Sequence, residues 1–390
     1  MANEREYDIV IYGATGYTGQ LVAEYLARKK GQGTRWAMAG RSADKLTAVR
    51  DEIGAPADTP LITADANDAQ SLRRMVSNTR CIITTVGPYQ SYGSDLVAAC
   101  AELGTDYVDL SGEPLWMHEM IAAHHDTAVA TGARIVHSCG FDSIPSDLGV
   151  LFLQNAAKQQ FGKPCQRVRL RVRGMNGEFS GGTAASLNET MAAIGKNPEL
   201  FNVLVNPFCL ADDFQGPEQP ADNKPYEDEV LGQWVAPFIM AAINTKNVHR
   251  SNKVLGHPYG TDFLYDEMTL CGPGDEGKAV ADMVASMNPL IGDDVPQPGE
   301  GPSRESREAG NFDLLLVGTT DDGQQINAAV TGDMDPGYGS TSKMIAESAV
   351  CLVTECPDTP GGFHTSASAM GDTLIKRLVD HAGLTFNLES

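Results

Sequence analysis

The chain has 390 residues, with 29 Lys and Arg against 51 Asp and Glu, which gives a formal net charge of −22. This length predicts two or three domains, and the charge argues against nucleic acid and anionic membranes as main partners. The eight scattered cysteines, the charged N-terminal residues and the lack of a long apolar stretch predict a cytoplasmic protein without a transmembrane segment.

The first predicted elements are a strand, a glycine-rich turn and a helix. Residues 8–12 are a short apolar run, and residues 20–30 carry apolar side chains at helical spacing. In such a unit the glycines allow a tight turn, close approach of a pyrophosphate to the backbone, and close packing of the helix on the strand. The N–H groups at the helix N-terminus favour phosphates. The residues predicted to bind a dinucleotide here are Gly13, Ala14, Thr15, Gly16, Tyr17, Thr18 and Gly19.

The ends of the second and third predicted strands indicate which dinucleotide is bound. The second strand, residues 35–39, is not followed by the carboxylate that binds the ribose 2′-OH in NAD-specific sites. Arg41 and Ser42 lie there instead, and a guanidinium suits a 2′-phosphate, so the sequence predicts NADP(H) in preference to NAD(H). The alternative is that Arg41 is only a surface residue. Asp65, after the third strand (61–64), either faces the adenine or caps the next helix.

A loop after the fourth predicted strand, residues 81–86, is predicted to lie where the nicotinamide must sit. By strand order the loop is at the carboxyl end of the sheet, so Gly87, Pro88 and Tyr89 are predicted to contact the cofactor. A phenol donates a hydrogen bond at neutral pH, which makes Tyr89 and Tyr92 candidate catalytic residues, unless their rings only pack in the cleft. Strands and helices continue to alternate after this loop, the pattern of a doubly wound parallel sheet.

The segment HSCGFDSIPSDLG, residues 137–149, follows the last strand of this sheet and leads into the second domain. Its proline and its serine and aspartate residues suit a turn and a helix start. A functional interpretation places Cys139, Asp142 or Ser143 at the floor of the cleft, and these are candidate catalytic residues. We expect neither a metal site nor a nucleophilic cysteine, because no further ligand pattern is present and hydride transfer needs no covalent step.

The second domain contains three segments that suit a substrate site. Residues 166–173 alternate as a strand with four arginines on one face, which is either a solvated face paired with carboxylates, a subunit interface or an anion site. The apolar residues 236–245 belong to the core or line an acyl-chain tunnel. Glycines before a helical segment expose N–H groups that suit a carboxylate, a thioester oxygen or a phosphate, unless the threonine is only a helix cap. These last substrate candidates are Ser180, Gly181, Gly182 and Thr183.

Later in the chain, turn and apolar patterns predict further elements. Residues 312–319 and 325–331 are strand candidates separated by a segment with a DG turn, which indicates a hairpin. Residues 342–355 are predicted to form a helix. Residues 293–307 are rich in Pro, Gly and charge, and are predicted to form an exposed loop.

Several segments resemble the saccharopine dehydrogenase-like oxidoreductases, and among them the trans-acting enoyl reductases. The segments are VIYGATGYTG, GPYQSYG, YVDLSGE, HSCGFDSIPSDLG, FSGGTAAS, APFIMAAINT, GYGSTSKM and GGFHTSASAMGDTLIKRL, and they span nearly the whole chain. The resemblance implies an α/β fold with a Rossmann NADP-binding domain, a doubly wound parallel sheet, over residues 1–145. It implies an α/β domain for substrate binding and dimerisation over residues 146–340. Residues 341–390 are then expected to pack on the first domain.

The same resemblance implies an NADPH-dependent oxidoreductase that reduces a C=C bond of an acyl or lipid-like substrate, either free or bound to a carrier. One alternative is a saccharopine-type reductase or dehydrogenase that acts on a C–N bond of an imine or amino acid, which a basic face in the second domain favours. The other alternative is a non-catalytic NADP(H)-binding protein of lipid metabolism. Large two-domain reductases of this type often pair through the substrate-domain sheet, so a homodimer is a further expectation.

Overall fold

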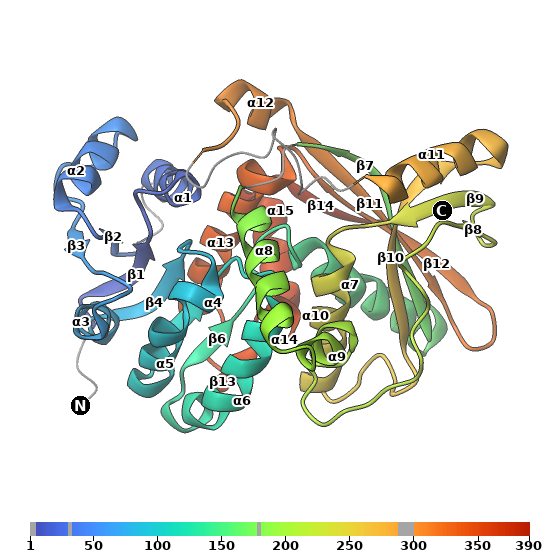
Figure 1. Cartoon of the computed structure of the whole chain (residues 1–390), viewed down its shortest axis with the longest axis horizontal. Helices are drawn as coiled ribbons and strands as arrows, with labels where there is room; N and C mark the ends of the chain where they lie inside the picture. Colours follow the sequence, from blue (N-terminus) through green and yellow to red (C-terminus); the bar gives the residue numbers. More distant parts are fainter. Residues whose placement is uncertain (1–4, 30–32, 178–180, 288–299) are drawn as a thin grey trace.

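The described residues are organised around two seven-stranded sheets that lie side by side (Figure 1). The computed structural model describes residues 5–29, 33–177, 181–287 and 300–390, and the side chains of residues 181–184 are outside that description. None of the helices in these ranges is both long and apolar enough to cross a membrane.

The first sheet is wholly parallel, in the order β13-β6-β5-β4-β1-β2-β3. Its strands are β1 (Tyr7–Tyr12), β2 (Trp36–Gly40), β3 (Leu61–Thr63), β4 (Thr79–Thr84), β5 (Asp106–Val108), β6 (Arg134–Val136) and β13 (Gly362–His364). Its helices are α1 (Tyr17–Arg28), α2 (Ala43–Glu52), α3 (Ala69–Ser77), α4 (Tyr89–Tyr92), α5 (Ser94–Leu103), α6 (Pro114–Thr131) and α13 (Thr341–Thr354). Helices α1 and α13 pack on one face and α3, α5 and α6 on the other, which confirms the predicted doubly wound sheet. Strand order reverses at β1, which lies between β4 and β2, so a crevice forms beyond the carboxyl ends of these strands.

Side-chain caps set where two of these helices begin. Ser42 caps α2 by accepting a hydrogen bond from the Lys45 N–H at 3.3 Å. Asp68 caps α3 by accepting hydrogen bonds from the N–H groups of Gln70 and Ser71. The caps satisfy N–H groups that have no partner inside a helix. The start of each of these helices is therefore determined by a residue next to it in the sequence.

The second sheet is mixed, in the order β14-β12-β11-β7-β10-β9-β8. Its strands are β7 (Arg167–Asn176), β8 (Tyr226–Asp228), β9 (Gln233–Pro237), β10 (Leu264–Gly272), β11 (Asn311–Thr319), β12 (Gln325–Gly332) and β14 (Leu384–Glu389). The helical elements of this part are α7 (Ile144–Phe161), α8 (Gly181–Lys196), α9 (Leu200–Val205), α10 (Ala241–Val254), α11 (Gly274–Ser286), α12 (Arg304–Ala309), the π-helical turn η1 (Pro336–Ser340), α14 (Ser366–Ala369) and α15 (Gly371–His381). β7 and β10 run parallel and the other neighbours antiparallel. The predicted hairpin is confirmed as β11 and β12, with Leu315 opposite Ala329.

Helix α7 connects the two sheets. It begins at Ile144 with a proline in its first turn, as the sequence predicts for this segment, and packs on β11 and β12. Gly149 permits the close approach, because a Cβ there would lie 3.0 Å from Val330 and 3.2 Å from Leu316. The loop that precedes α7 is therefore held between the two sheets.

The C-terminal segment is divided between the two sheets. Helix α13 packs on α1 and on the first sheet, and β13 extends that sheet by pairing with β6. Strand β14 instead pairs with β12 of the second sheet, with Thr385 opposite Thr331. The expectation that residues 341–390 pack on the first domain therefore does not hold for the last strand, because β14 pairs with the otherwise open edge of β12.

The C-terminal part of the loop expected over residues 293–307 is helical. Helix α12 begins at Arg304, and its N-cap Ser303 accepts a hydrogen bond from the Ser306 N–H at 3.1 Å. This cap stabilises a short helix within a segment that lacks a long apolar face. Residues 293–299 lie outside the described residues.

Three of the four arginines of β7, Arg167, Arg171 and Arg173, pair with carboxylates, but the face that they share is not wholly solvated. Arg171 is fully buried, with N–O distances of 2.8 Å to Asp228 and 2.9 Å to Asp266. Arg173 pairs with Asp313 at 2.8 Å. Strands β8 and β10 bring these buried carboxylates against β7 from distant parts of the sequence. Internal ion pairs therefore occupy arginines that an anion site would need.

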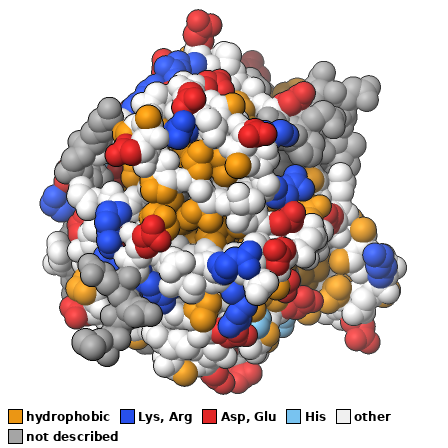
Figure 2. All heavy atoms as spheres, turned by 90° about the vertical axis from the view of Figure 1, so that its left-hand side faces the viewer, with side chains coloured by type: hydrophobic (Ala, Val, Ile, Leu, Met, Phe, Trp, Pro, Cys, Tyr) orange, Lys and Arg blue, Asp and Glu red, His pale blue; other side chains and the backbone are white. Residues whose placement is uncertain are grey.

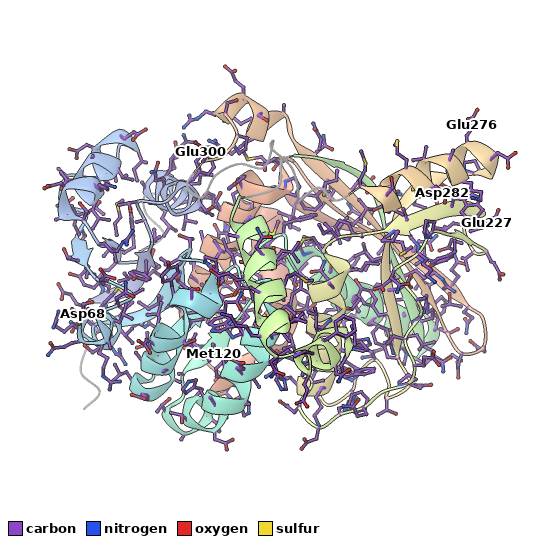
Figure 3. All side chains as sticks on the ribbon, viewed as in Figure 1. Asp68, Met120, Glu227, Glu276, Asp282 and Glu300 are labelled. Carbon is purple, nitrogen blue, oxygen red and sulfur yellow. The ribbon has the colours of Figure 1, made fainter. Side chains whose placement is uncertain are left out.

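The acidic excess of the chain includes carboxylates at both ends of the molecule. Asp68 lies at one end, and Glu227, Glu276 and Asp282 lie at the other; all four side chains are exposed (Figure 3). Side chains of both charges are interspersed among hydrophobic ones on the face shown in Figure 2. These carboxylates therefore contribute to a distributed surface charge.

Candidate functional site

The glycine-rich turn between β1 and α1 has little room for side chains. Gly13 adopts a φ of +92°, and a Cβ there would lie 2.8 Å from the Thr85 hydroxyl oxygen. A Cβ at Gly19 would lie 2.2 Å from the Gly13 carbonyl oxygen, so α1 packs directly on the turn. Gly16 is the N-cap of α1 and supplies no side-chain cap, which leaves the helix N-terminus suited to phosphates. The turn therefore fits the pyrophosphate of a dinucleotide.

The other predicted residues of this turn follow the same path. Ala14 is buried and Thr15 continues the turn, while Tyr17 and Thr18 form the start of α1 and line the adjoining cavity. The Tyr17 ring contacts the Tyr338 ring edge-on, with centroids 4.9 Å apart. This contact joins the cofactor turn to the π-helical turn η1, which precedes α13.

Arg41 lies immediately after β2, at the edge where the adenosine of a dinucleotide binds. Its side chain is exposed, and among the described residues it forms no ion pair. Ser42 caps α2, so its hydroxyl has a structural role. Asp65 does not cap α3, because Asp68 does; its carboxylate accepts a hydrogen bond from the Asn67 N–H at 2.9 Å. Of these residues, Arg41 has a charge available to a bound anion.

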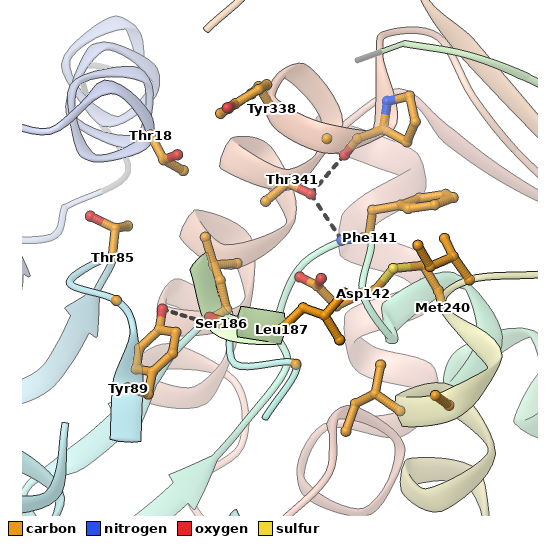
Figure 4. Close-up of a pocket in the computed structure, with 18 of the residues that line it drawn as sticks. Thr18, Thr85, Tyr89, Phe141, Asp142, Ser186, Leu187, Met240, Tyr338 and Thr341 are labelled. Carbon is orange, nitrogen blue, oxygen red and sulfur yellow. Dashed lines mark hydrogen bonds between the residues drawn. The ribbon is translucent and has the colours of Figure 1, made fainter. Parts of the chain in front are cut away.

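A cavity of about 430 Å³ begins at the glycine-rich turn and extends between the two sheets (Figure 4). One end is formed by the start of α1, the loop after β4 and η1. The other end is formed by α8, α9 and the start of α10. Its aliphatic lining residues there are Leu187, Leu204, Ile239, Met240 and Ile243. A polar end beside the cofactor turn thus continues into an apolar end in the second domain.

The two candidate tyrosines lie in different surroundings. Gly87 and Tyr89 line the cavity, and Pro88 is the N-cap of α4. The Tyr89 hydroxyl donates a hydrogen bond to the Thr84 carbonyl oxygen at 3.2 Å and accepts one from the Leu110 N–H at 3.1 Å. Burial raises the pKa of Tyr89 well above its usual value. The Tyr89 hydroxyl is therefore engaged by the backbone.

Tyr92 is 43% exposed, and it is not among the described residues that line the cavity. Both tyrosines belong to the short helix α4, in which Tyr89 is the buried residue. The structure thus brings Tyr89, but not Tyr92, to the cavity wall.

The candidates that follow β6 are also separated by the fold. Cys139 is fully buried, and burial raises the pKa of its thiol well above the usual value. Ser143 donates a hydrogen bond to Asn244 at 2.9 Å and accepts one from Asn247 at 2.7 Å. Asp142 lines the cavity, where burial and the nearby carboxylate of Asp109 raise its pKa to about 7. Asp142 is therefore the candidate of this segment that faces the cavity.

Glu113, which no sequence motif singles out, lies where the two parts of the site meet. Its buried carboxylate accepts hydrogen bonds from the N–H groups of Tyr89 and Gln90, both at 2.8 Å, and from the Ser186 hydroxyl at 2.6 Å. Burial raises the pKa of Glu113 despite these hydrogen bonds. The available signal is its position after the fifth strand of a parallel sheet, at the edge that carries the cofactor loops.

Three of the four predicted substrate residues lie at the start of α8 rather than in a loop that precedes it. Ser180 lies outside the described residues, and Gly181, Gly182 and Thr183 form the first turn of α8. The described side chains that α8 contributes to the cavity come later in the helix. They are Ser186, Leu187 and Thr190.

Known proteins resemble this one at two levels, a family model over the first domain and relatives over nearly the whole chain. Residues 9–136 match the saccharopine dehydrogenase NADP binding domain. The chain is 40% identical to a Mycobacterium tuberculosis H37Rv protein provisionally named trans-acting enoyl reductase Rv2449c, over 97% of this chain and 96% of that one. It is 37% identical to the trans-acting enoyl reductase of Mycobacterium bovis BCG, over 96% of each chain.

A solved structure shares the fold at much lower sequence identity. Apo saccharopine dehydrogenase (L-Glu forming) from Saccharomyces cerevisiae aligns with a TM-score of 0.55 and 10% identity, over 98% of this chain and 100% of that one. The first domain binds NADP(H), and the protein is an NAD(P)H-dependent oxidoreductase. By identity over nearly its full length, the chain belongs to the trans-acting enoyl reductases of the saccharopine dehydrogenase-like family.

Proposed function

We propose that this protein reduces a C=C bond conjugated to the carbonyl of an acyl thioester, with NADPH as the hydride donor. The observation that carries the proposal is the cavity that begins at the cofactor turn and ends among aliphatic side chains of α8, α9 and α10. Relatives that share 37–40% of the sequence are named trans-acting enoyl reductases. The thioester would lie near the turn, with its acyl chain in the apolar end.

The charge of the cavity favours an acyl substrate over an amino acid. The described residues that line it include Asp142 and Glu300 but no Lys, Arg or His. Saccharopine-type substrates carry carboxylates, which need basic partners when they are removed from water. Arg171 and Arg173 do not meet this need, because carboxylates of the protein itself hold them.

The aliphatic end supplies binding energy and excludes water. Each methylene group of an acyl chain that moves from water into this end stabilises the complex by about 0.8 kcal/mol. When bound, NADPH supplies the hydride, while the protein holds the acyl group beside it and shields the reacting carbons. The proposed preference for NADPH is supported by Arg41, which follows β2 and whose guanidinium would pair with a 2′-phosphate that NADH lacks.

The test is a panel of trans-2-enoyl N-acetylcysteamine thioesters of increasing chain length, with loss of NADPH absorbance as the signal. A second panel pairs 2-oxo acids with amino acids and reports imine reduction. We expect turnover of the enoyl panel, with kcat/KM rising as the chain lengthens. Turnover of the imine panel alone would support the alternative C–N chemistry, and tight NADPH binding without turnover would support a non-catalytic protein.

A matched pair of variants tests whether the aliphatic end holds the chain. Leu204 of α9 lines the cavity, whereas its neighbour Val205 does not line it and is 56% exposed. L204W should lower kcat/KM for long-chain thioesters by about tenfold or more, the effect of losing about 1.4 kcal/mol of binding, and spare short ones. V205W should leave kcat/KM unchanged for both long-chain and short-chain thioesters.

Two further measurements test the expected partners. Turnover of coenzyme A thioesters is compared with turnover of carrier-protein thioesters, which tests whether the substrate is carrier-bound. Sedimentation of the purified protein tests the predicted homodimer.

A further inference from the structure

We infer that Asp142 is the acid that protonates the α carbon of the substrate after hydride has added to the β carbon. The inference rests on the proposed function. Asp142 lies in the connection between β6 and α7, so it is held where the two sheets meet. Figure 4 shows its carboxyl group directed into the cavity, between the polar and the aliphatic ends.

Contacts on both sides hold the backbone around Asp142. The Phe141 N–H donates a hydrogen bond to the Thr341 hydroxyl at 2.9 Å, and that hydroxyl donates to the Pro336 carbonyl oxygen at 2.7 Å. On the other side, Ser143 is bound by two asparagines of α10. A Cβ on Gly140 would lie 2.7 Å from Leu110, so the loop also packs closely against the segment that follows β5. The direction of the Asp142 side chain is thus set by the main chain.

The surroundings of Asp142 favour its neutral form. Burial is the main cause that raises its pKa to about 7, and the carboxylate of Asp109 raises it further. Asp109 itself is bound to His137, with an Nδ1–Oδ2 distance of 2.6 Å. The other ionisable side chains in the described lining are Tyr17, Tyr89, Glu300 and Tyr338, and none is basic. A carboxyl group with a pKa near neutrality can hold a proton and release it to a stronger base.

Three hydroxyl groups of the cavity, those of Tyr89, Tyr338 and Ser186, donate to acceptors within the protein. Tyr89 donates to the Thr84 carbonyl oxygen, and Tyr338 to that of Glu300 at 3.3 Å. Ser186 donates to Glu113. Asp142, in contrast, forms no ion pair within the described part of the chain and no hydrogen bond with another side chain there; its carboxyl group is contacted by its own backbone N–H. Its proton is therefore available to a molecule in the cavity.

The proposed step balances in atoms and charge. Hydride adds to the β carbon, the C=C electron pair shifts toward the carbonyl, and an enolate of the thioester forms. The enolate then re-forms its carbonyl while the α carbon takes the proton of Asp142. A C–H bond forms, the carboxyl O–H bond breaks, and water returns a proton to the Asp142 carboxylate. The substrate thus gains one hydride and one proton, and NADPH is oxidised to NADP⁺.

The experiment uses a 2-methyl-2-enoyl N-acetylcysteamine thioester, because reduction makes its α carbon stereogenic. We compare the wild-type protein with D142N and E267Q, and measure both the rate and the configuration of the product. Glu267 is the matched control: it is fully buried with a pKa raised to about 7, but it is not among the described cavity residues. A third measurement follows the Asp142 carboxyl carbon by NMR during a pH titration of the cofactor-free protein, with D142N for assignment.

We expect D142N to lower kcat by about 10²–10⁴-fold while its NADPH affinity and melting temperature stay near those of the wild type. Its residual product should have mixed configuration at the α carbon, because water then delivers the proton from either side. E267Q should keep the wild-type configuration. The Asp142 signal should titrate near neutrality, which tests the carboxyl in the wild-type protein even if a variant folds poorly.

Three results would overturn the assignment. D142N could form product of single configuration at the wild-type rate, or the Asp142 signal could titrate near the ordinary aspartate pKa of about 3.9. The defect could also occur in E300Q and not in D142N, which would assign the proton to the other cavity carboxyl. In each case wild-type turnover leaves the proposed function standing. Absence of turnover by the wild type on every enoyl thioester instead refutes the proposed function, and the donor role with it.

Discussion

The Ser186 hydroxyl of α8 donates a 2.6 Å hydrogen bond to the carboxylate of Glu113, on the loop after β5. The same carboxylate accepts the N–H groups of Tyr89 and Gln90 at the start of α4. One buried group therefore ties the cofactor loop to the helix that carries part of the acyl cavity. The Glu113 carboxylate thus helps to position both the cofactor loop and the acyl cavity.

This relationship predicts unequal effects of removing its two members. E113A leaves two N–H groups without an acceptor, at a cost of about 1–3 kcal/mol each in the free energy of unfolding. S186A removes one hydrogen bond and should cost about 1 kcal/mol. Urea unfolding measures both. The control is S91A, which removes the surface hydrogen bond from Ser91 to Glu189 and should cost less than either; equal losses in E113A and S91A would contradict the prediction.

The contact of Gly19 with Gly13 predicts that any side chain at Gly19 disrupts the cofactor turn. In G19A the new methyl group would meet the Gly13 carbonyl oxygen, so α1 must move away from the turn. We expect a loss of about 1–3 kcal/mol in stability, as for other overpacked sites, and loss of NADPH binding by fluorescence titration. In G195A, within α8, the methyl group meets no atom within 4 Å, and binding should be unchanged. Unaltered NADPH affinity in G19A would rule out the role of this contact.

Arg41 is predicted to determine cofactor preference. A charge-assisted hydrogen bond contributes about 1.5–3 kcal/mol, so R41A should raise the Kd for NADPH by about 10–100-fold and leave that for NADH unchanged. R73A is a suitable control. Arg73 lies on α3, which packs on the same sheet, and it pairs with Glu102 at the protein surface. Isothermal titration with both cofactors provides the measurement. Equal weakening of the two cofactors in R41A would indicate that the residue does not contact the 2′-phosphate.

Buried carboxyl groups predict a specific pH dependence of stability. Burial raises the pKa of Glu267 to about 7, above its value in the unfolded chain, so the folded protein holds this proton more tightly. The stabilisation is complete below the unfolded pKa and is lost as pH rises through the folded pKa. Its size is on the order of 3 kcal/mol, from about 1.4 kcal/mol for each pKa unit.

The comparison of wild type with E267Q isolates this contribution, because the buried His249 and His364 have lowered pKa values and act with the opposite sign. The unfolding free energy of the wild type, measured in urea at a series of pH values, should fall relative to that of E267Q between about pH 5 and pH 8. A constant difference across that range would show that Glu267 titrates alike in the folded and unfolded chains.

The parts of the fold that the sequence could predict depend on neighbouring residues. The turn at Gly13, Gly16 and Gly19, the alternation of strands and helices, and the hairpin of β11 and β12 all leave local patterns of glycine, apolar spacing and turn residues. Arg41 is predicted in the same way, because the end of β2 is reached directly from β1 and α1. Strand order then indicates which loops share an edge.

Only the tertiary structure decided which candidate side chains face the cavity. Ser186 and Glu113 are 73 positions apart, and Arg171 meets its carboxylates through two other strands. The sequence ranked Tyr89 and Asp142 alike as candidates, but packing gives the Tyr89 hydroxyl backbone partners and leaves the Asp142 carboxyl facing the cavity. Local patterns determined the fold class and the cofactor turn because their forces act between near neighbours. The orientation and protonation of the site depend on burial, which distant segments create together.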